Sequence, residues 1–400
     1  MRVVGIIAEY NPLHNGHIYH LEEAKRRSGA EECIVVMSGN FVQRGEPACT
    51  DKFTRAEWAL QAGADLVLEL PSCFAVASAE RFAEGAVKTL AATGVVTDLA
   101  FGVETKNYAA LERIANLLDR QPSNFRLILL HHLKEGKSYP RAQYEALSDF
   151  GLPQDELELL KLPNNILAIE YLKCLRRFAP HIRPLPIERI GNRYNDTELS
   201  DTVSGATAIR EAFKNGDDRV YDALPLYVSG ALRFDAQFPL TLSDMGPMIL
   251  QKIRSMSLEE LSQIPDVNEG FEQLLFKAVR KCVTVEELLE AVKSRRYTMA
   301  RCKRILICAL LGIRSELAET LLSSPEHLYL RVLGLQRIGR GLLSAVASAG
   351  TAPVLLRNSD LNRLSDAARF SVSIDACSTD LLAFALRRDL HRDSQSAVSV

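Results

Sequence analysis

The chain has 400 residues, of which 47% are hydrophobic and 24% are charged, and its 48 lysines and arginines nearly balance its 50 aspartates and glutamates. This composition excludes a disordered, collagen-like or coiled-coil chain, and the length predicts two or three domains with cores of their own. A formal net charge of −2 gives no global attraction to a polyanion, so a nucleic-acid site has to be a local basic patch.

The same composition bears on the compartment. The longest apolar runs are shorter than the roughly 20 residues that span a bilayer, and the first residues, MRVVGIIAEYNP, lack the pattern of a signal peptide. The eight cysteines contain no CxxC pair, which argues against a zinc site. We therefore expect a cytoplasmic protein that holds no metal of its own and has neither a membrane nor DNA as a partner.

The first two hundred residues alternate between two kinds of pattern. Apolar runs with the length of buried strands lie at Val3–Ala8, Cys33–Met37, Leu66–Leu70 and Leu99–Phe101, and a further strand is predicted at Pro184–Ile190. Helical patterns lie at His17–Arg27, Thr54–Ala62, Ala79–Ala92, Asn107–Leu118 and Asn165–Phe178. Such alternation predicts a parallel sheet with helices on both faces, in which ligands bind beyond the carboxyl ends of the strands.

After about residue 215 the pattern changes. Strand signals nearly vanish, and amphipathic helical segments are predicted at Met248–Met256, Gly270–Cys282, Val285–Val292, Met299–Leu311 and Pro325–Leu333. We therefore predict an α/β fold with a Rossmann-like parallel-sheet domain over residues 1–215, followed by a mainly helical domain over residues 216–400.

The segment Glu9–His20, EYNPLHNGHIYH, follows the first predicted strand. Gly16 removes a side chain where the backbone has to approach a ligand, and the helix that begins near His17 directs free N–H groups into the crevice, which suits phosphate. Beside such a cradle, His14 and His17 can act as catalytic groups that donate hydrogen bonds to oxygens whose charge grows during nucleotidyl transfer. The alternative is that the histidines bind zinc or pack on the surface, but their position at a helix start favours nucleotide binding.

Two motifs resemble those of one superfamily. His-x-Gly-His, here HNGH, resembles the signature of HIGH-type nucleotidyltransferases, which include cofactor adenylyltransferases and class I aminoacyl-tRNA synthetases. SGATAIR, Ser204–Arg210, resembles the second motif of that superfamily. The resemblance implies that a hydroxyl or backbone N–H of this motif, at Ser204 or Thr207, holds the β- and γ-phosphates together with Arg210.

Four longer segments resemble the bacterial tRNA(Met) cytidine acetate ligase family: GIIAEYNPLHNGHIYHL (Gly5–Leu21), MSGNFVQRGEPA (Met37–Ala48), DKFTRAEWALQAGADLVLELP (Asp51–Pro71) and LPNNILAIEYL (Leu162–Leu172). The resemblance implies an enzyme that uses ATP, with the Mg²⁺ that ATP carries, to activate acetate as acetyl-adenylate. It then implies transfer of the acetyl group to N4 of the wobble cytidine, position 34, of elongator tRNA(Met). Leu13, where the family commonly has Phe, removes no polar group.

The resemblance also implies which residues bind ATP. It assigns this role to the segment Ile7–His20, to Gly102, to the amides of PNN and to the neighbours Arg189 and Ile190. With the second motif, the predicted ATP-binding residues are Ile7, Ala8, Glu9, Tyr10, Asn11, Pro12, His14, Asn15, Gly16, His17, His20, Gly102, Asn164, Asn165, Arg189, Ile190, Ser204, Thr207 and Arg210. By residue type alone, Gly102 can equally be an ordinary turn, Asn164 a helix N-cap and Arg189 a solvated surface residue.

The loop after the second predicted strand, SGNFVQRGEP, is densely polar, and loops in this position commonly carry function. The residues that we expect to face acetate or the target nucleotide are Ser38, Asn40, Gln43 and Arg44. Arg44 can offer two parallel hydrogen bonds to a carboxylate such as acetate, or to a phosphate. A loop that only pairs with Glu46 or Asp51 is an equally weighted alternative.

The predicted helical domain contains one strongly basic segment, KSRRYTMARCKR (Lys293–Arg304), which has no acidic residue. Interleaved Lys and Arg with an aromatic residue fit a surface that neutralises an RNA backbone and stacks on an unpaired base. The candidate tRNA-binding residues are Arg295, Arg296, Tyr297, Lys303 and Arg304. A solvated helix face is the alternative, and the tRNA substrate implied by the resemblance favours docking.

Two other classes of function compete with the ligase. A small-molecule adenylyltransferase of the same superfamily needs little beyond the α/β domain, whereas this chain has almost half its length in the predicted helical domain. A non-catalytic RNA-binding protein with a vestigial nucleotide fold is disfavoured because His14, Gly16, His17 and Arg210 are all present.

Overall fold

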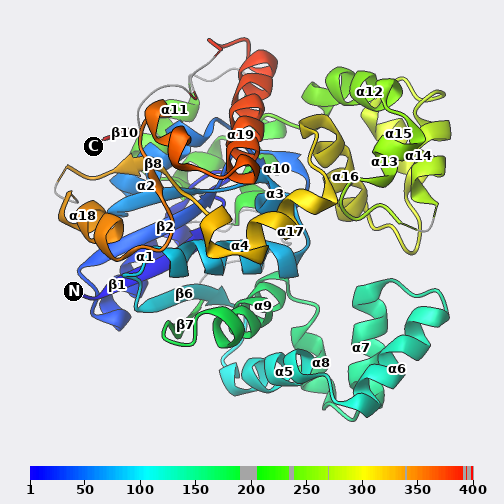
Figure 1. Cartoon of the computed structure of the whole chain (residues 1–400), viewed down its shortest axis with the longest axis horizontal. Coiled ribbons are helices and arrows are strands. Elements are labelled where there is room, and N and C mark those ends of the chain that lie inside the picture. The colour runs from blue at the N-terminus through cyan, green and yellow to red at the C-terminus, as the bar shows by residue number, and fades with distance from the viewer. Residues whose placement is uncertain are drawn as a thin grey trace.

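A mostly parallel sheet forms the centre of the molecule (Figure 1). The computed structural model describes residues 1–189, 205–233, 238–268, 270–337, 340–390, 393 and 398–399. Five parallel strands stand in the order β5 (Leu66–Leu70), β2 (Glu32–Ser38), β1 (Val3–Ala8), β6 (Asp98–Val103) and β7 (Arg183–Glu188). The α/β fold with a Rossmann-like parallel sheet is therefore confirmed, and the carboxyl ends of these strands meet at one edge.

Both faces of the sheet are buried, as expected for strands whose residues are nearly all apolar. Neighbouring residues of β2 point to opposite faces, so Val36 joins one hydrophobic cluster and Val35 the other. Helices α4 (Ala79–Ala92) and α9 (Pro163–Phe178) cover the Val36 face, and α1 (Asn15–Ser28) and α2 (Lys52–Gln61) cover the Val35 face.

The C-terminal half is mainly helical, but it also completes the sheet. Strand β8 (Leu330–Leu335) pairs antiparallel with β5, and the short strands β9 (Val354–Leu355) and β10 (Val398–Ser399) pair with β8. The sheet therefore crosses the boundary that the sequence predicts between residues 215 and 216.

The helical prediction for Pro325–Leu333 is wrong. A short 3₁₀ turn, Pro325–His327, precedes β8. Leu330 and Val332 face one hydrophobic cluster and Leu333 faces the other, which is the alternation of a strand rather than of a helix.

Two groups of helices extend away from the sheet (Figure 1). The first comprises α5 (Tyr108–Arg120), α6 (Ser123–Lys134), α7 (Tyr139–Asp149) and α8 (Gln154–Leu159). The second, which we call the helical lobe, comprises α12 (Gly246–Ser255), α13 (Leu258–Ser262), α14 (Phe271–Ala278), α15 (Val285–Val292) and α16 (Met299–Leu311). The two groups contact each other where Nε of Arg296 donates a hydrogen bond to the Gly136 carbonyl at 3.2 Å.

The remaining elements lie on the body of the molecule. They are the hairpin of β3 (Phe41–Val42) and β4 (Glu46–Pro47), and the helices α3 (Ser72–Ala75), α10 (Ala206–Lys214), α11 (Leu226–Arg233), α17 (Ser315–Ser323), α18 (Arg340–Ala349) and α19 (Asp366–Ala385). Among the described residues, no helix is both long and apolar enough to cross a membrane.

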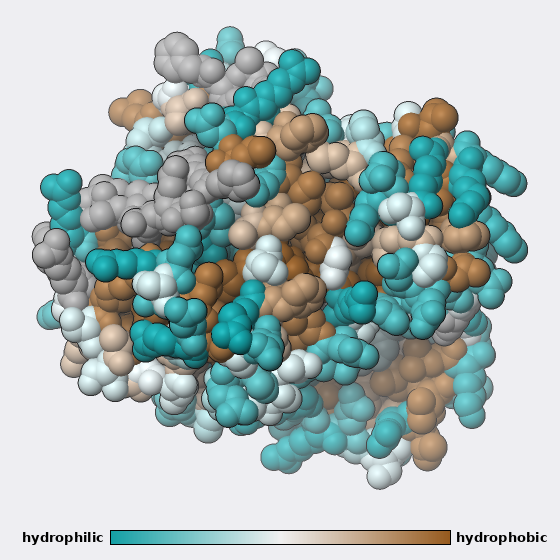
Figure 2. Space-filling view, turned by 45° about the horizontal axis from the view of Figure 1, so that its top comes forward, coloured by the Kyte–Doolittle hydropathy of each residue, from teal (hydrophilic) through white to brown (hydrophobic). Residues whose placement is uncertain are grey.

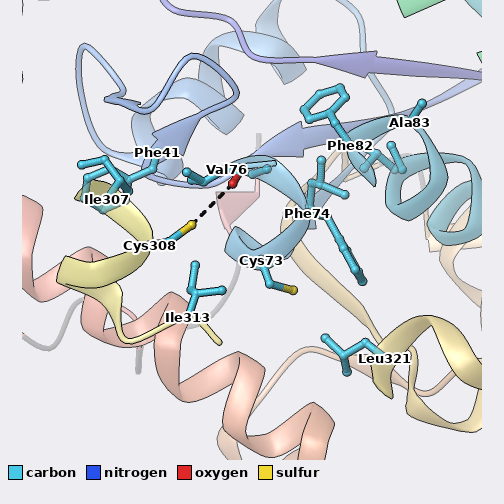
Figure 3. Close-up of a cluster of buried hydrophobic side chains, with 14 of the residues drawn as sticks. Phe41, Cys73, Phe74, Val76, Phe82, Ala83, Ile307, Cys308, Ile313 and Leu321 are labelled. Atoms are coloured by element: carbon cyan, nitrogen blue, oxygen red, sulfur yellow. Dashed lines mark hydrogen bonds between the residues drawn. The ribbon is translucent and has the colours of Figure 1, made fainter. Parts of the chain in front are cut away.

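An apolar joint fixes the helical lobe to the body. Phe41, Phe74 and Ile307 belong to one buried cluster that both halves of the chain share (Figure 3). Beside them, the Cys308 thiol donates to the Val76 carbonyl at 3.6 Å. Figure 2 shows apolar side chains gathered in the middle of the surface, between the body and the lobe at the right.

A buried ionic cluster links the two halves of the chain as well. The Lys52 ammonium lies 2.7 Å from Glu69 at the end of β5 and 2.5 Å from Asp393. Arg331 of β8 contacts the same two carboxylates, at 3.4 Å from Glu69 and 2.8 Å from Asp393. Lys52 and Glu69 are essentially inaccessible to water, so each charge depends on these partners.

Candidate nucleotide-binding site

A cavity, which we call the main cavity, lies beyond the carboxyl ends of β1, β6 and β7 and faces the first residues of α1 and α10. The predicted ATP-site residues that line it are Ile7, Ala8, Glu9, Tyr10, Asn11, His14, Gly16, His17, His20, Gly102, Asn164, Arg189, Thr207 and Arg210. Segments far apart in the sequence therefore converge on one cavity. Ile190 and Ser204 lie outside the described residues.

Three of the predicted residues, Pro12, Asn15 and Asn165, do not line the main cavity. The Asn15 side chain donates to the Asp222 carbonyl at 3.1 Å. Asn165 is fully buried, and its Oδ1 accepts a hydrogen bond from the Glu104 backbone N–H at 2.8 Å. The structure thus gives Asn15 and Asn165 positions that link segments of the chain.

The two histidines of HNGH are built into the start of α1. His14 is the N-cap and is buried, and its Nδ1 accepts a hydrogen bond from the Gly16 N–H at 3.1 Å. The His17 ring stacks on it, with ring centroids 3.7 Å apart, and its Nδ1 accepts from the His14 N–H at 3.3 Å. A neutral imidazole carries one proton, so both rings hold it on Nε2. Each of these histidines can therefore donate one Nε2–H to a ligand.

Burial and the nearby arginines keep these rings neutral. Desolvation, followed by the charges of Arg189 and Arg210, lowers the pKa of His14 to about 3, and desolvation with Arg189 lowers the pKa of His20 to about 4. The pKa of His17 is lowered first by burial and then by the neighbouring His14. At neutral pH the cavity thus combines uncharged N–H donors with fixed guanidinium charges.

Arg210 reaches from α10 to the loop after β1. Its Nη1 donates to the Asn11 carbonyl at 2.7 Å, which holds the arginine in the wall of the main cavity. In the same loop Tyr10 is buried and has a φ of 47°, in the left-handed region that strains a residue with a side chain. Contacts around the loop therefore impose its conformation.

One of these contacts comes from Arg55 of α2, which is completely buried. Its guanidinium donates to the Glu9 carbonyl at 2.7 Å and to the Ser38 carbonyl at 3.1 Å, and it also contacts the Gly39 carbonyl. These carbonyls belong to the loops after β1 and β2. Sequence reasoning missed this residue, although it lies in the segment DKFTRAEW that carries the family resemblance.

The loops after β1 and β2 also meet at Glu9. The Gln43 backbone N–H donates to Oε1 of Glu9 at 2.8 Å, and Gln43 and Arg44 both line the main cavity. Burial raises the pKa of Glu9, while the Gln43 N–H and the charges of Arg210 and Arg44 act in the opposite direction. Two of the four predicted loop residues thus reach the cavity.

Ser38 and Asn40, by contrast, are buried and do not line the cavity. The Asn40 amide donates to Oγ1 of Thr379 at 2.9 Å, and its Oδ1 accepts from the Lys52 backbone N–H at 2.9 Å. The prediction that these two residues face acetate or the target nucleotide is therefore wrong. Polarity alone does not distinguish a buried amide that connects segments from one that faces a ligand.

Gly102 and Arg189 lie side by side on β6 and after β7. A Cβ at Gly102 would lie 3.3 Å from Cγ of Arg189, so the missing side chain makes room for the arginine across the strand. The Arg189 N–H donates to the Val103 carbonyl at 3.0 Å. Asn164 is not a helix N-cap, because Leu162 occupies the N-cap position of α9. The Asn164 backbone N–H donates to Oε1 of Glu104 at 3.2 Å.

The main cavity has further walls that the sequence did not reveal: Ile6, Tyr19, Val42, Glu46, Phe82, Leu167, Tyr171, Ile187, Glu188, Gly205 and Ala206. The end of β7 was open to prediction from the rule that ligands bind beyond strand ends. Phe82 and Tyr171 come from α4 and α9, where their spacing indicates only a buried helix face.

The basic segment of the helical lobe is divided between surface and interior. Arg295 and Arg296 are exposed, whereas Lys303 pairs with Glu46 at 2.5 Å and Arg304 with Asp266 at 3.2 Å. The Tyr297 side chain is buried: its ring stacks on Phe271 with centroids 4.0 Å apart, and its hydroxyl donates to Asn268 at 2.6 Å. The prediction that Tyr297 stacks on a base is wrong, because the ring is part of the core of the lobe.

Comparison with known proteins places this geometry in a family. The model of the HIGH Nucleotidyl Transferase family matches residues 1–396. A relative from Acetivibrio thermocellus, named tRNA(Met) cytidine acetate ligase, is 37% identical over 98% of this chain and 97% of its own length. The crystal structure of Thermotoga maritima TmcAL without ligand is 33% identical and superposes over 100% of both chains with a TM-score of 0.93. A second structure of that protein, bound with alpha-thio ATP, superposes over the same range with a TM-score of 0.91. The chain therefore belongs to the HIGH nucleotidyl transferases and, within them, to the tRNA(Met) cytidine acetate ligase family.

Proposed function

We propose that this protein uses ATP to activate acetate as acetyl-adenylate and then acetylates N4 of the wobble cytidine, position 34, of elongator tRNA(Met). The observation that carries the proposal is the main cavity, where the neutral rings of His14 and His17 lie at a helix start beside Arg210. The name of the relatives and the alpha-thio ATP bound to the Thermotoga protein support the same reading.

The cavity suits the triphosphate of ATP. The first turn of α1 directs the positive end of the helix dipole at the cavity, which favours phosphate, while its Gly16 and His17 N–H groups are bonded to His14. The Nε2–H groups of His14 and His17 are placed to donate to oxygens whose charge grows as pyrophosphate leaves. Arg210 neutralises the far phosphates. The buried Nε2 of His20, which has no hydrogen-bond partner among the described residues, offers a further polar contact to the ligand.

Adenylation solves the chemical difficulty of using acetate. The oxygen of a carboxylate leaves poorly, so cytidine cannot displace it directly. When an acetate oxygen attacks the α-phosphorus, pyrophosphate leaves, and the acetyl group then carries AMP as a good leaving group. The guanidinium of Arg44, at the rim of the cavity, can hold the incoming carboxylate with two parallel hydrogen bonds.

The Mg²⁺ that accompanies ATP is held in this proposal by the phosphates, as is usual for this ion. Two of the three carboxylates that line the cavity already contact protein groups, because Glu9 accepts the Gln43 N–H and Glu46 accepts the Lys303 ammonium. Bound there, the ion would supply positive charge beside the pyrophosphate.

Docking of tRNA is assigned to the helical lobe. Arg295 and Arg296 are exposed on it, and cations of this kind neutralise phosphates of an RNA backbone. Location in the cytoplasm, where tRNA and ATP are both present, stays a prediction.

The test is an incubation of the protein with ATP, labelled acetate and bulk tRNA, followed by nucleoside analysis and by separation of the nucleotide products. We expect label in N4-acetylcytidine of one methionine tRNA, together with AMP and pyrophosphate. Formation of ADP and phosphate, or acetylation from acetyl-CoA without ATP, contradicts the mechanism. A dinucleotide product with unlabelled tRNA points instead to a small-molecule adenylyltransferase.

A further inference from the structure

A second cavity, which we call the side cavity, lies between the body and the helical lobe. Glu46 of β4 and Arg210 of α10 line both the main cavity and the side cavity. The other walls of the side cavity come from residues 239–243 and from α15 and α16. A substrate held in the side cavity therefore approaches the reacting groups of the main cavity across Glu46 and Arg210.

The walls of the side cavity combine apolar surface with charged side chains of both signs. The apolar side chains are Pro47, Pro239, Leu240, Leu242, Leu289 and Met299. The charged side chains are three cations, Arg210, Lys214 and Lys303, and three carboxylates, Glu46, Glu286 and Glu290. Apolar walls accept the flat face of an unstacked base, and cations neutralise the phosphates on either side of it, so the lining suits one nucleotide extruded from an RNA loop.

One carboxylate has the position that an aminated base requires. The exocyclic N4 group of cytosine is a hydrogen-bond donor, and carboxylates are its usual acceptors in proteins. Of the carboxylates that line the main cavity, Glu9, Glu46 and Glu188, only Glu46 also lines the side cavity. Its Oε1 accepts the Lys303 ammonium at 2.5 Å, whereas its Oε2 accepts no hydrogen bond from a described residue. Oε2 is therefore available to an incoming amino group.

The fold fixes Glu46 relative to the helical lobe. Glu46 pairs with Val42 in the β3–β4 hairpin, and the turn between the two strands packs on the start of α16. Gly45 has a φ of 72° there, and a Cβ on it would overlap the backbone of Lys303 and Arg304. The hairpin and α16 thus hold the carboxylate and the Lys303 ammonium in one arrangement.

The charge state of Glu46 also suits a proton acceptor. Burial acts to raise its pKa, but the Lys303 hydrogen bond and the charges of Lys303 and Arg210 outweigh it, so the pKa lies below the ordinary value. The carboxylate is therefore ionised at neutral pH. A carboxylate is basic enough for this step, because the nitrogen becomes strongly acidic once it has bonded to the acetyl carbon.

We propose that the side cavity receives the unpaired target cytosine of tRNA and that Glu46 is the catalytic residue that accepts its N4 proton, an inference that rests on the proposed function. The N4 lone pair attacks the acetyl carbonyl carbon of acetyl-adenylate, and the new C–N bond forms. The C–O bond to AMP then breaks, and AMP leaves with the electron pair. One N4 proton passes to Glu46, so the products are the acetylated cytosine, AMP and one proton.

The test separates the two half-reactions. Acetate-dependent exchange of pyrophosphate into ATP measures adenylation, and acetylation of a tRNA(Met) transcript measures transfer. In Glu46→Gln we expect exchange at the rate of the unsubstituted protein and transfer lowered by about 10²–10⁴, the range for loss of a general base. Glu158→Gln is the matched control, because this exposed carboxylate likewise pairs with a lysine, Lys161, but neither residue lines a cavity, and it should leave both rates unchanged.

Two further variants test the site by other readouts. Lys303→Met removes the ammonium that holds the pKa of Glu46 down, so the acid limb of the pH profile for transfer should move to higher pH while that for exchange stays in place. Thr241→Trp fills the side cavity from residues 239–243 and should block transfer without weakening exchange or tRNA binding.

The outcomes distinguish this inference from the proposed function. If the unsubstituted protein shows neither acetate-dependent exchange nor acetylated cytidine, the proposed function is wrong. If it is active and Glu46→Gln transfers at the normal rate, or loses exchange as fully as transfer, Glu46 is not the proton acceptor. Normal transfer by Thr241→Trp overturns the assignment of the side cavity.

Discussion

His14 has two ring nitrogens with separate tasks, and a single substitution can separate them. Nδ1 caps α1 by accepting the Gly16 N–H, and Nε2–H is the donor assigned to the reacting phosphate. His14→Asn keeps a side-chain oxygen for the cap, because Asn is a favoured N-cap residue, but it has no group at the position of Nε2. His14→Ala removes both.

The magnitudes follow from these two losses. Loss of one preorganised transition-state donor costs about 10²–10³ in rate, or about 2.7–4 kcal/mol, so both variants should lose that much of the acetate-dependent pyrophosphate exchange. Loss of the cap costs about 1 kcal/mol of unfolding free energy, and this cost should appear in the alanine variant alone. The assays are exchange kinetics and urea denaturation followed by circular dichroism.

The reasoning is refuted if His14→Asn exchanges at the normal rate, since the Nε2–H would then have no part in the transition state. Equal stability of the two variants would instead remove His14 from its capping role. The stability cost of His14→Ala is expected because the ring is buried and caps the helix.

Three further predictions concern pH, charge and RNA. The pKa of His20 is about 4 in the folded protein against 6.5 ordinarily, so the unfolded chain binds a proton that the folded chain does not. Stability should therefore fall as the pH drops from 6.5 toward 4. Thermal unfolding should show this fall in midpoint temperature, and His20→Asn should make the fall smaller. Lys52→Met removes the buried positive charge beside Glu69 and Asp393 and should lower the unfolding free energy by about 3–5 kcal/mol. Urea denaturation measures this loss. A nearly unchanged unfolding free energy would show that the ionic cluster does not stabilise the fold. Replacing both Arg295 and Arg296 by Glu should weaken tRNA binding and reduce the salt dependence of its affinity, while the rate of pyrophosphate exchange stays unchanged. An unchanged tRNA affinity would favour the alternative that these arginines belong only to a solvated helix face.

The parts of the fold that sequence reasoning found are those with local signals. The strands β1, β2 and β5 are mostly apolar. The HNGH motif follows the first of them, so the rule that ligands bind beyond strand ends located the main cavity. Strand β8 was not predicted from the sequence, because its partner β5 lies far earlier in the chain. The apolar pattern of β8 itself resembles one face of a helix.

The residues that sequence reasoning misplaced or missed share one property. Asn40, Arg55 and Tyr297 are polar or amphipathic groups whose burial depends on partners from distant segments. Residue type and spacing carry no information about such partners. The same holds for Glu46, whose importance appears only when β4 and α16 are seen together.

The antiparallel pairing of β8 with β5 has a consequence for how a ribosome delivers this protein. The N-terminal strands emerge first, and β5 then remains an edge with unpaired backbone groups until β8 has been synthesised, a state that invites aggregation. Until Arg331 and Asp393 have been synthesised, Lys52 and Glu69 also lack these two partners of the buried ionic cluster. A nascent chain stopped at residue 215 should therefore bind chaperones and not fold on its own. The nucleotide site should become functional only near the end of translation.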